Sequence, residues 1–370
     1  MQYSALEPVL YLAFELGQTR WKLGFTTGLG QRPRERTIAA RDVGRLAEEI
    51  GRAKERFGLA PTVRVVSCYE AGRDGFWLHR YLLAQGITSH VVDSASIKVN
   101  RRRRRAKSDR LDVGKLLWQL VRYVAGERKV WSVVHVPTAA EEDRRQMHRE
   151  LVTVKRDRAR VTNRIKGLLA NQGVELEVMG GFLGLLDQVW LWDGRPLPAG
   201  LRARLVREWT KVALLTEQIA ALEAERQEAL RTAEDPAVER VRQLLRLRGI
   251  GTNSAWLYVM EFFGWRAFRN RREVGALAGL TPTPYQSGEA SREQGIAKAG
   301  NRSIRAMAIE IAWLRFQPAS ELSRWYEARF GQGSSRVRRI GIVALARRLL
   351  VELWRYLEPG AVPAGAVLKA

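Results

Sequence analysis

Cysteine and histidine are scarce in this sequence. Among its 370 residues there is one cysteine, Cys68, and there are four histidines. A single thiol excludes an intramolecular disulfide and a thiolate metal cluster, and it fits a reducing compartment. The histidines are scattered and give neither a metal-ligand spacing nor a Ser-His-Asp pattern. They stand at positions 79, 90, 135 and 148.

Long apolar runs are missing as well. No stretch reaches the roughly 18 apolar residues that a membrane-spanning helix needs. The N-terminus also lacks the basic-then-apolar plan of a signal peptide. We therefore expect a soluble, cytoplasmic protein with no membrane partner.

Acidic residues are few relative to basic ones. Asp and Glu total 39 against 63 Lys and Arg, which gives a formal net charge of +24. A charge of this size and sign indicates a polyanionic partner, such as nucleic acid. The chain is 46% hydrophobic, enough to bury well-packed cores, and its length predicts two or three domains.

The first third of the chain alternates strand-like and helix-like segments. Apolar, β-rich runs predict strands at 9–16, 20–28, 62–69 and 87–93. Helices are predicted at 41–57, 74–85 and 109–124. The alternation predicts an α/β domain around a mixed sheet over residues 1–135, with Cys68 buried in a strand.

From residue 136 onward the pattern becomes helical. Over 136–235, apolar stripes from Met147 to Leu168 and from Leu205 to Leu222 advance in steps of three and four. They predict an antiparallel helical pair or an intersubunit coiled coil, and a plain bundle fits equally well. Residues 236–357 are predicted to be mainly helical and 358–370 to be a flexible tail. The predicted fold class is therefore α/β plus all-α.

Four carboxylates in the first domain are candidate metal ligands. Glu15 and Glu70 each stand where a predicted strand ends, and Asp109 and Asp112 would share one face of a helix start. Such oxygens suit Mg²⁺ or Mn²⁺, which often work in pairs at phosphoryl-transfer sites. A structural role fits the aspartates too, Asp109 at the helix N-terminus and Asp112 in solvent. Glu15 needs a partner or a metal, since its strand is otherwise apolar.

A run of five arginines precedes the aspartates. Adjacent guanidiniums repel one another unless a polyanion neutralises them, and arginine suits bidentate phosphate contact. A solvated loop or a localisation signal would have the same composition, but the position between candidate metal ligands favours a nucleic-acid backbone. The predicted contact residues are Arg101, Arg102, Arg103, Arg104, Arg105 and Lys107.

A glycine pair separates two helix-like segments in the C-terminal part. Gly249 and Gly251 flank Ile250 in "LRGIGTNSAW". This resembles a helix-hairpin-helix, whose backbone amides contact phosphates without reading bases. A plain turn between helices is the alternative.

The polar stretch 281–301 predicts a functional loop. It holds Ser287, whose hydroxyl could attack a phosphodiester, and Lys298, which with Arg302 could stabilise the added charge. Taken alone, a loop serine is more often a turn residue.

Taken in order, these segments resemble one family. The runs are "FELGQTRWKLGF", "YEAGRDGFWLHRYL", "KSDRLDVGKLL", "LRGIGTNSAW" and "SGEASREQGIAKAGNRSIR". Their order and separation resemble the DEDD-type insertion-sequence transposases of family one hundred and ten, described as bridge-RNA-guided recombinases. The resemblance covers nearly the whole chain. It implies an RNase-H-like (RuvC-like) mixed-sheet domain, a coiled-coil connector, and a helical C-terminal transposase domain with a helix-hairpin-helix-like element.

The resemblance also implies residue roles and partners. Glu15, Glu70, Asp109 and Asp112 correspond to the family's divalent-metal ligands, although the first is usually Asp. The nucleophilic serine corresponds to Ser287, with Ser291 as the second choice. The implied partners are donor and target DNA and a structured noncoding bridge RNA. The implied assembly is a homodimer or homotetramer, and the implied setting is a bacterial or archaeal nucleoid.

Two other functions fit parts of the sequence. A RuvC-like structure-selective nuclease would use the carboxylates and water to hydrolyse DNA without a serine intermediate, but the C-terminal half argues against it. A non-enzymatic nucleic-acid-binding protein would need the basic surface and neither the carboxylates nor Ser287.

Overall fold

A computed structural model of the chain describes residues 7–97, 109–287, 290–311 and 313–369. The chain divides into two compact units, residues 1–136 and 137–370. None of the described helices is both long and apolar enough to cross a membrane.

The first unit is built on a five-stranded mixed sheet with the order β3-β2-β1-β4-β5. β1, β2 and β3 form an antiparallel meander, whereas β4 and β5 run parallel to β1. The predicted mixed sheet is therefore confirmed, although one edge strand, β3, was not predicted. The strands are β1 (Val9–Leu16), β2 (Arg20–Thr26), β3 (Arg34–Ala39), β4 (Arg64–Glu70) and β5 (Thr88–Val92).

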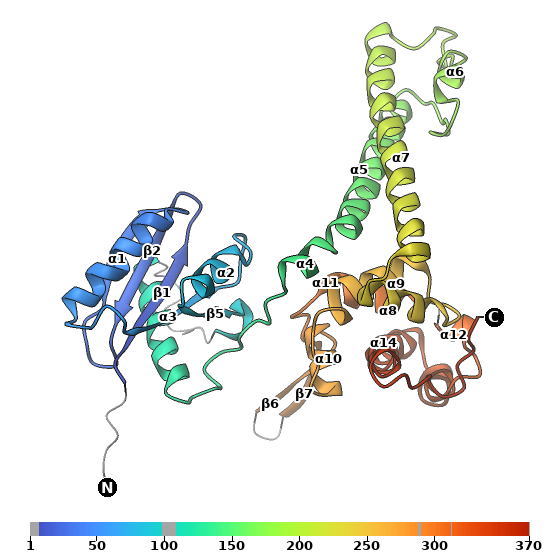
Figure 1. The fold of residues 1–370 in the computed structure, drawn as a ribbon. Coiled ribbons are helices and arrows are strands. Elements are labelled where there is room, and N and C mark those ends of the chain that lie inside the picture. The colour runs from blue at the N-terminus through green and yellow to red at the C-terminus, as the bar shows by residue number, and fades with distance from the viewer. Residues whose placement is uncertain (1–6, 98–108, 288–289, 312, 370) are drawn as a thin grey trace. The chain divides into compact units, whose positions relative to one another are not determined.

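Helices cover both faces of this sheet. Side chains alternate along β1, so that Leu12 and Phe14 pack in one core with α1 and α2, and Ala13 packs in another with α3 (Figure 1). Cys68 is fully buried on the α3 side, as predicted for a strand residue, and burial raises the pKa of its thiol. The helices are α1 (Val43–Arg56), α2 (Trp77–Ala84) and α3 (Asp109–Val124), and a short 3₁₀ turn, η1 (Ser94–Ser96), follows β5.

A buried ion pair joins the edge strand β3 to α1. Arg34 and Glu49 are 7% and 2% exposed, and Nη2 of Arg34 lies 2.5 Å from Oε2 of Glu49. Arg45 and Arg52 each place a guanidinium nitrogen 3.3 Å from Oε1 of the same carboxylate. Burial by itself raises the pKa of Glu49, but the three arginines outweigh burial and hold that pKa below its ordinary 4.5.

We expect Glu49→Gln to lower the free energy of unfolding by about 3–5 kcal/mol, because it leaves the charge of Arg34 buried without its partner. The depressed pKa stabilises the wild type fully above pH 4.5, and this contribution is lost as pH falls through the folded-state pKa. Urea unfolding of the full chain at neutral and at acid pH measures both effects.

Glu48→Gln on the same helix is the matched control, since the Glu48 side chain is 56% exposed and exposed pairs contribute little. Equal destabilisation by the two variants would contradict a special role for the Glu49 pairs.

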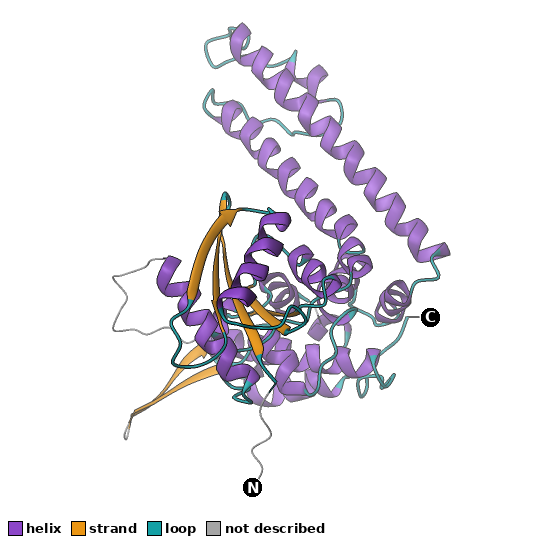
Figure 2. Ribbon diagram, turned by 60° about the vertical axis from the view of Figure 1, so that its left-hand side comes forward, coloured by secondary structure: helices purple, strands orange, loops and turns teal. Residues whose placement is uncertain are grey.

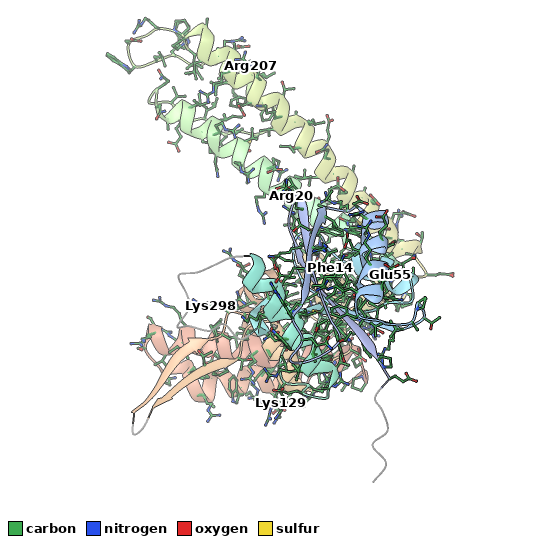
Figure 3. All side chains as sticks on the ribbon, turned by 90° about the vertical axis from the view of Figure 1, so that its left-hand side faces the viewer. Phe14, Arg20, Glu55, Lys129, Arg207 and Lys298 are labelled. Atoms are coloured by element: carbon green, nitrogen blue, oxygen red, sulfur yellow. The ribbon has the colours of Figure 1, made fainter. Side chains whose placement is uncertain are left out.

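The second unit opens with two long helices that lie side by side and antiparallel (Figures 1 and 2). The predicted apolar stripes face each other, with Ile165 beside Leu205 in one cluster and Leu151 beside Ile219 in another. Charged residues project from the outer faces, Arg207 among them (Figure 3). The antiparallel helical pair predicted from the stripes therefore forms within one chain. The elements are α4 (Ala139–Asp143), α5 (Gln146–Ala170), α6 (Phe182–Leu186) and α7 (Ala199–Thr232).

The rest of the second unit is a helical core with one hairpin. Its largest buried side chains include Tyr258, Phe262, Phe263 and Trp313. The helices are α8 (Pro236–Leu245), α9 (Thr252–Tyr258), a π-helical turn η3 (Val259–Phe263), α10 (Arg271–Leu277), α11 (Arg302–Glu310), α12 (Trp313–Phe316), α13 (Glu321–Tyr326), a second π-helical turn η4 (Glu327–Gly331) and α14 (Ser335–Leu357).

The predicted loop at 281–301 is largely a β-hairpin. Its strands are β6 (Pro282–Ser287) and β7 (Ala290–Ile296), which pair antiparallel. The prediction was wrong because the stretch has almost no apolar alternation, which is the signal that marks a half-buried strand. Two residues between paired strands is instead the spacing of a tight hairpin.

The flexible tail predicted at 358–370 is also wrong for its described part. The amide of Lys369 donates to the carbonyl of Arg246 at 2.6 Å, and Arg248 donates to Val367 at 3.1 Å. The side-chain amide of the fully buried Gln317 donates from Nε2 to the Val367 carbonyl at 2.8 Å and accepts at Oε1 from the Val367 amide at 2.7 Å. The Gly- and Pro-containing composition of residues 358–370 suggested a frayed chain end. In the structure, backbone groups of Val367 and Lys369 instead form hydrogen bonds with the segment between α8 and α9.

Candidate active site and nucleic-acid contacts

The two predicted glutamates stand at the same edge of the sheet. Phe14 of β1 pairs with Tyr69 of β4 in parallel register, so the next residues along the two strands are Glu15 and Glu70. Both lie two residues beyond Ala13 and Cys68, whose side chains belong to the core beneath α3. Because side chains alternate along a strand, Glu15 and Glu70 share this α3-covered face.

The predicted aspartates stand at the start of the helix that covers this face. Asp109 is the first residue of α3 and Asp112 lies in its first turn; their side chains are outside the described part. Val113, the next residue, has Cγ1 3.4 Å from the place that a Cβ would take on Gly24, a residue of β2 opposite Ala13. The first turn of α3 thus packs close to the end of β1 that carries Glu15.

The side chains that the structure describes contain no group of three or more His, Cys, Asp or Glu placed to hold a metal ion. The described side chains include those of Glu15 and Glu70 but not those of Asp109 and Asp112. The glutamates supply the oxygen donors that Mg²⁺ prefers, so the described residues fit part of a divalent-metal site. The full set of four stays a prediction.

Two polar residues near this edge were not predicted. Lys22 lies directly opposite Glu15 in the antiparallel register, so it shares the same face, and its Nζ lies 3.4 Å from Glu35 Oε2. Asp93 follows the last residue of β5, whose neighbour in register is Glu70. Two features of the sequence could have indicated these residues. Lys22 interrupts the largely apolar run "RWKLGF", and Asp93 ends the strand-like run "ITSHVVD".

The arginine run falls outside the described residues. Arg101 to Arg105 and Lys107 belong to the segment between η1 and the first residue of α3. Their contact with nucleic acid stays a prediction.

The glycine pair does connect two helices. Gly249 has φ +88°, and a Cβ there would lie 3.2 Å from Cβ of Phe316, so this position needs glycine. Gly251 is the residue before α9. Arg226 of α7 is buried beside this turn and donates to the side chain of Asn253 at 2.9 Å. Gly249 and Gly251 thus lie in the connection between α8 and α9, which fits both a helix-hairpin-helix and a plain turn. The helix-hairpin-helix and its contact with phosphate stay a prediction.

Both candidate serines belong to the hairpin. Ser287 is the last residue of β6 and pairs with Ala290, and Ser291 pairs with Gln286. Their side chains are outside the described part. The four carboxylates lie in the first compact unit and Ser287 in the second.

A tightly packed loop presents the two predicted cations. The amide of Lys298 donates to Gly279 at 3.2 Å, and Asn301 donates to Leu277 at 2.9 Å. Gly300 has φ +113°, and a Cβ there would collide with the Leu277 carbonyl. Lys298 (Figure 3) and Arg302 are exposed, so they are held at the surface by backbone contacts.

Comparison with known proteins gives consistent matches. A family model described as "Transposase IS116/IS110/IS902 family" matches residues 241–327. The Sinorhizobium fredii protein named "Putative transposase y4rJ" is 42% identical over 386 residues, covering 97% of this chain and 94% of that protein. The "Transposase for insertion sequence element IS1328" of Yersinia enterocolitica is 27% identical, covering 62% of this chain and 68% of that protein.

Proposed function

The chain belongs to the IS116/IS110/IS902 family of transposases, and from this premise we propose that it cuts and rejoins DNA through a serine-linked intermediate under the guidance of a structured noncoding RNA. The observation that carries the catalytic part is the shared sheet edge and shared face of Glu15 and Glu70. The matched segment 241–327 contains Ser287, Lys298 and Arg302.

The first unit is proposed to be an RNase-H-like, RuvC-like carboxylate domain. Three antiparallel strands followed by two strands parallel to β1, with helices on both faces, support this proposal. Glu15, Glu70, Asp109 and Asp112 would hold Mg²⁺ or Mn²⁺. When bound, such an ion neutralises charge at a phosphodiester and orients its oxygens. Glu15 stands where the family usually has Asp, and its longer side chain would place its oxygens differently.

The second unit is proposed to supply the nucleophile. Ser287 Oγ would attack a DNA phosphorus as its proton leaves, and the bond from phosphorus to the departing sugar oxygen would break. That oxygen takes up a proton, and the serine keeps the phosphate as a diester. Attack by a second DNA hydroxyl would then release the serine and rejoin the strand without ATP. The hydroxyl needs a base or a metal for activation.

Lys298 and Arg302 are proposed to stabilise the charge added to phosphorus. Neither forms an ion pair with a described acidic residue. Both are exposed. Lys298 lies on a loop whose backbone bonds Gly279, just after α10, and Arg302 is the first residue of α11, and these positions support contact with a phosphate.

The arginine run gives a salt-dependence prediction. Replacing Arg102, Arg103 and Arg104 with Gln should weaken binding to unrelated duplexes equally and flatten the plot of log affinity against log salt. Each lost phosphate contact removes about 0.9 from the slope for duplex DNA. Fluorescence anisotropy over a salt series measures this slope, and an unchanged slope would place the run outside the interface.

We assign the carboxylate domain to residues 1–135, the connector to 136–235 and the serine-bearing domain to 236–357. The connector is proposed to act as a coiled coil that supports a homodimer or homotetramer. The antiparallel packing of α5 on α7 supports its rigidity.

The experiment that tests the whole proposal is purification with transcripts of the flanking element, sequencing of any bound RNA, and strand exchange with Mg²⁺. We expect a structured RNA to co-purify and to direct exchange between donor and target DNA. Hydrolysis without rejoining or a covalent species would instead indicate a RuvC-like nuclease. Binding without any strand cleavage would indicate a non-enzymatic protein.

A further inference from the structure

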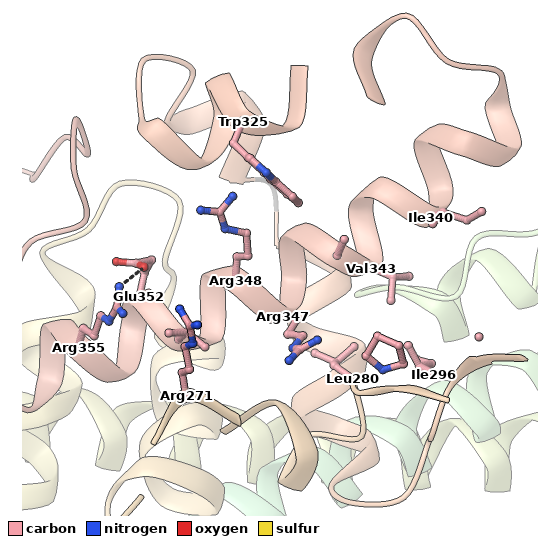
Figure 4. A pocket seen from close by; sticks show the side chains of 14 residues that line it. Arg271, Leu280, Ile296, Trp325, Ile340, Val343, Arg347, Arg348, Glu352 and Arg355 are labelled. Atoms are coloured by element: carbon pink, nitrogen blue, oxygen red, sulfur yellow. Dashed lines mark hydrogen bonds and ion pairs between the residues drawn. The ribbon is translucent and has the colours of Figure 1, made fainter. Parts of the chain in front are cut away.

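A cavity of about 540 Å³ opens in the second unit beside the base of the hairpin. Its walls come from the start of α10, Leu280 after that helix, the first and last residues of the hairpin, α13 and α14 (Figure 4). A volume of this size is ordinary for small-ligand pockets in proteins. None of its lining residues belongs to the sites described above.

One part of the cavity is apolar. Leu280 is 2% and Val351 9% exposed, and Ile296, Val343 and Ile340 complete this surface. Ile340 is 54% exposed, which places the apolar surface at an open mouth. An apolar wall that reaches solvent favours a ligand with a flat or apolar portion.

The other part is cationic. Arg271, Arg347 and Arg348 line it, and none of them forms an ion pair with a described acidic residue. The lining contains one carboxylate, Glu352, whose Oε1 lies 3.0 Å from Arg355 Nη1. The cavity therefore carries an uncompensated positive charge, which favours an anionic ligand.

Trp325 presents a ring at the cavity. The guanidinium carbon of Arg348 lies 4.3 Å from the Trp325 ring centroid, and Phe330 meets the same ring edge-on at 5.6 Å. Figure 4 shows Trp325 and Arg348 on the same side of the cavity. The guanidinium of Arg348 thus covers one face of the Trp325 ring, and nucleic-acid bases stack both on aromatic rings and on guanidinium planes.

Arg347 packs closely against α10 at Gly275. A Cβ on Gly275 would lie 3.0 Å from Nε of Arg347, so this glycine leaves the room in which the guanidinium packs. Gly275 is buried in a helix interior, where glycine is otherwise unfavourable. The Arg347 side chain is therefore partly buried and packed against α10.

We propose that this cavity binds one unpaired nucleotide of the DNA substrate, with its base on Trp325 and the apolar wall and its phosphate at Arg271 and Arg347. The inference rests on the proposed function for its choice of DNA. The ring, the apolar wall and the unpaired arginines match a flat base joined to an anion. Enzymes that act on a base hold the extruded base in a pocket between aromatic and apolar side chains.

The test measures binding and needs no cleavage, so it is carried out with the full-length Ser287→Ala protein. The probes are a perfect DNA duplex and the same duplex with one unpaired 2-aminopurine. We expect tighter binding of the second probe, with quenching of 2-aminopurine as it stacks. Trp325→Leu should lower that preference about tenfold and remove the quenching, whereas Trp325→Phe should retain most of both.

The matched control for Trp325 is Trp192→Leu, since Trp192 is 90% exposed and lies outside the cavity. The matched control for Arg347→Gln is Arg339→Gln, an exposed position on the same helix outside the lining. We expect Arg347→Gln to reduce the preference for the unpaired probe and Arg339→Gln to preserve it.

Four results would overturn the inference. One is unchanged quenching and preference in Trp325→Leu. Another is equal loss of preference in Arg347→Gln and Arg339→Gln, which would show a general charge effect. The third is displacement of the DNA probe by an acidic peptide, and the fourth is tighter binding of an RNA of matched sequence. Because strand exchange is not measured, failure here leaves the proposed function standing, and loss of strand exchange leaves this binding test interpretable.

Discussion

Ser287→Ala is expected to abolish DNA strand cleavage and the covalent protein–DNA species, while folding and RNA binding remain. The reason is chemical, because an alanine has no oxygen to attack phosphorus or to retain the phosphate. Ser287 is the last residue of β6 and pairs with Ala290 through its backbone, so loss of its hydroxyl removes no group that this pairing uses. Denaturing gel electrophoresis of protein on labelled DNA, with and without protease, measures the covalent species directly.

Ser291→Ala is the matched control, because Ser291 lies on the paired strand two positions from the same turn. Its cleavage rate should fall much less. A covalent species that persists in Ser287→Ala and disappears in Ser291→Ala would move the nucleophile to Ser291. Normal cleavage with no covalent species in the wild type would favour hydrolysis by water.

Glu70→Gln is expected to slow strand cleavage by roughly 10²–10⁴-fold with DNA binding retained, since a lost metal ligand removes several kcal/mol of charge stabilisation. Glu70 is exposed at the end of β4, so the substitution should not disturb the core. Cleavage rates over a Mg²⁺ and Mn²⁺ titration, with affinities measured in parallel, separate catalysis from binding.

Glu55→Gln is the control for this variant. Glu55 is exposed on α1 (Figure 3), the helix that covers the opposite face of the sheet, so its charge is removed from the same unit without touching the proposed ligands. Equal cleavage rates for Glu70→Gln and wild type would show that Glu70 is not a metal ligand. A parallel loss of DNA binding would assign it to the interface.

A strand made almost entirely of apolar residues could be predicted from the sequence. The run at 9–16 matches β1 in full, because its side chains enter one core on each face of the sheet in turn. The edge strand β3 could not, because its N-terminal buried side chain is Arg34. An arginine becomes a core residue there only through Glu49, which is supplied by the next helix.

The candidate site was only partly predictable for a related reason. Strand ends at Glu15 and Glu70 follow from the local pattern, but their adjacency depends on the parallel register of β1 and β4, which no local signal records. The cavity at Trp325 could not be predicted from the sequence at all. Arg271 and Arg347 belong to different helices, which come together only in the folded core. In the sequence, Gly275 only indicates a less stable helix. The structure shows that a Cβ at this position would lie 3.0 Å from Nε of Arg347.

The pairing of β1 with β4 also sets an order of events during folding. The antiparallel meander β1–β3 can close through short connections, whereas β4 must return across α1 to lie beside β1. Contacts between residues so far apart in sequence close slowly. A nascent chain that has been synthesised as far as β3 contains Glu15 but does not yet contain Glu70, the residue beside it in the sheet. If Glu15 and Glu70 hold a metal ion as proposed, we expect them to bind it together only after β4 has paired with β1.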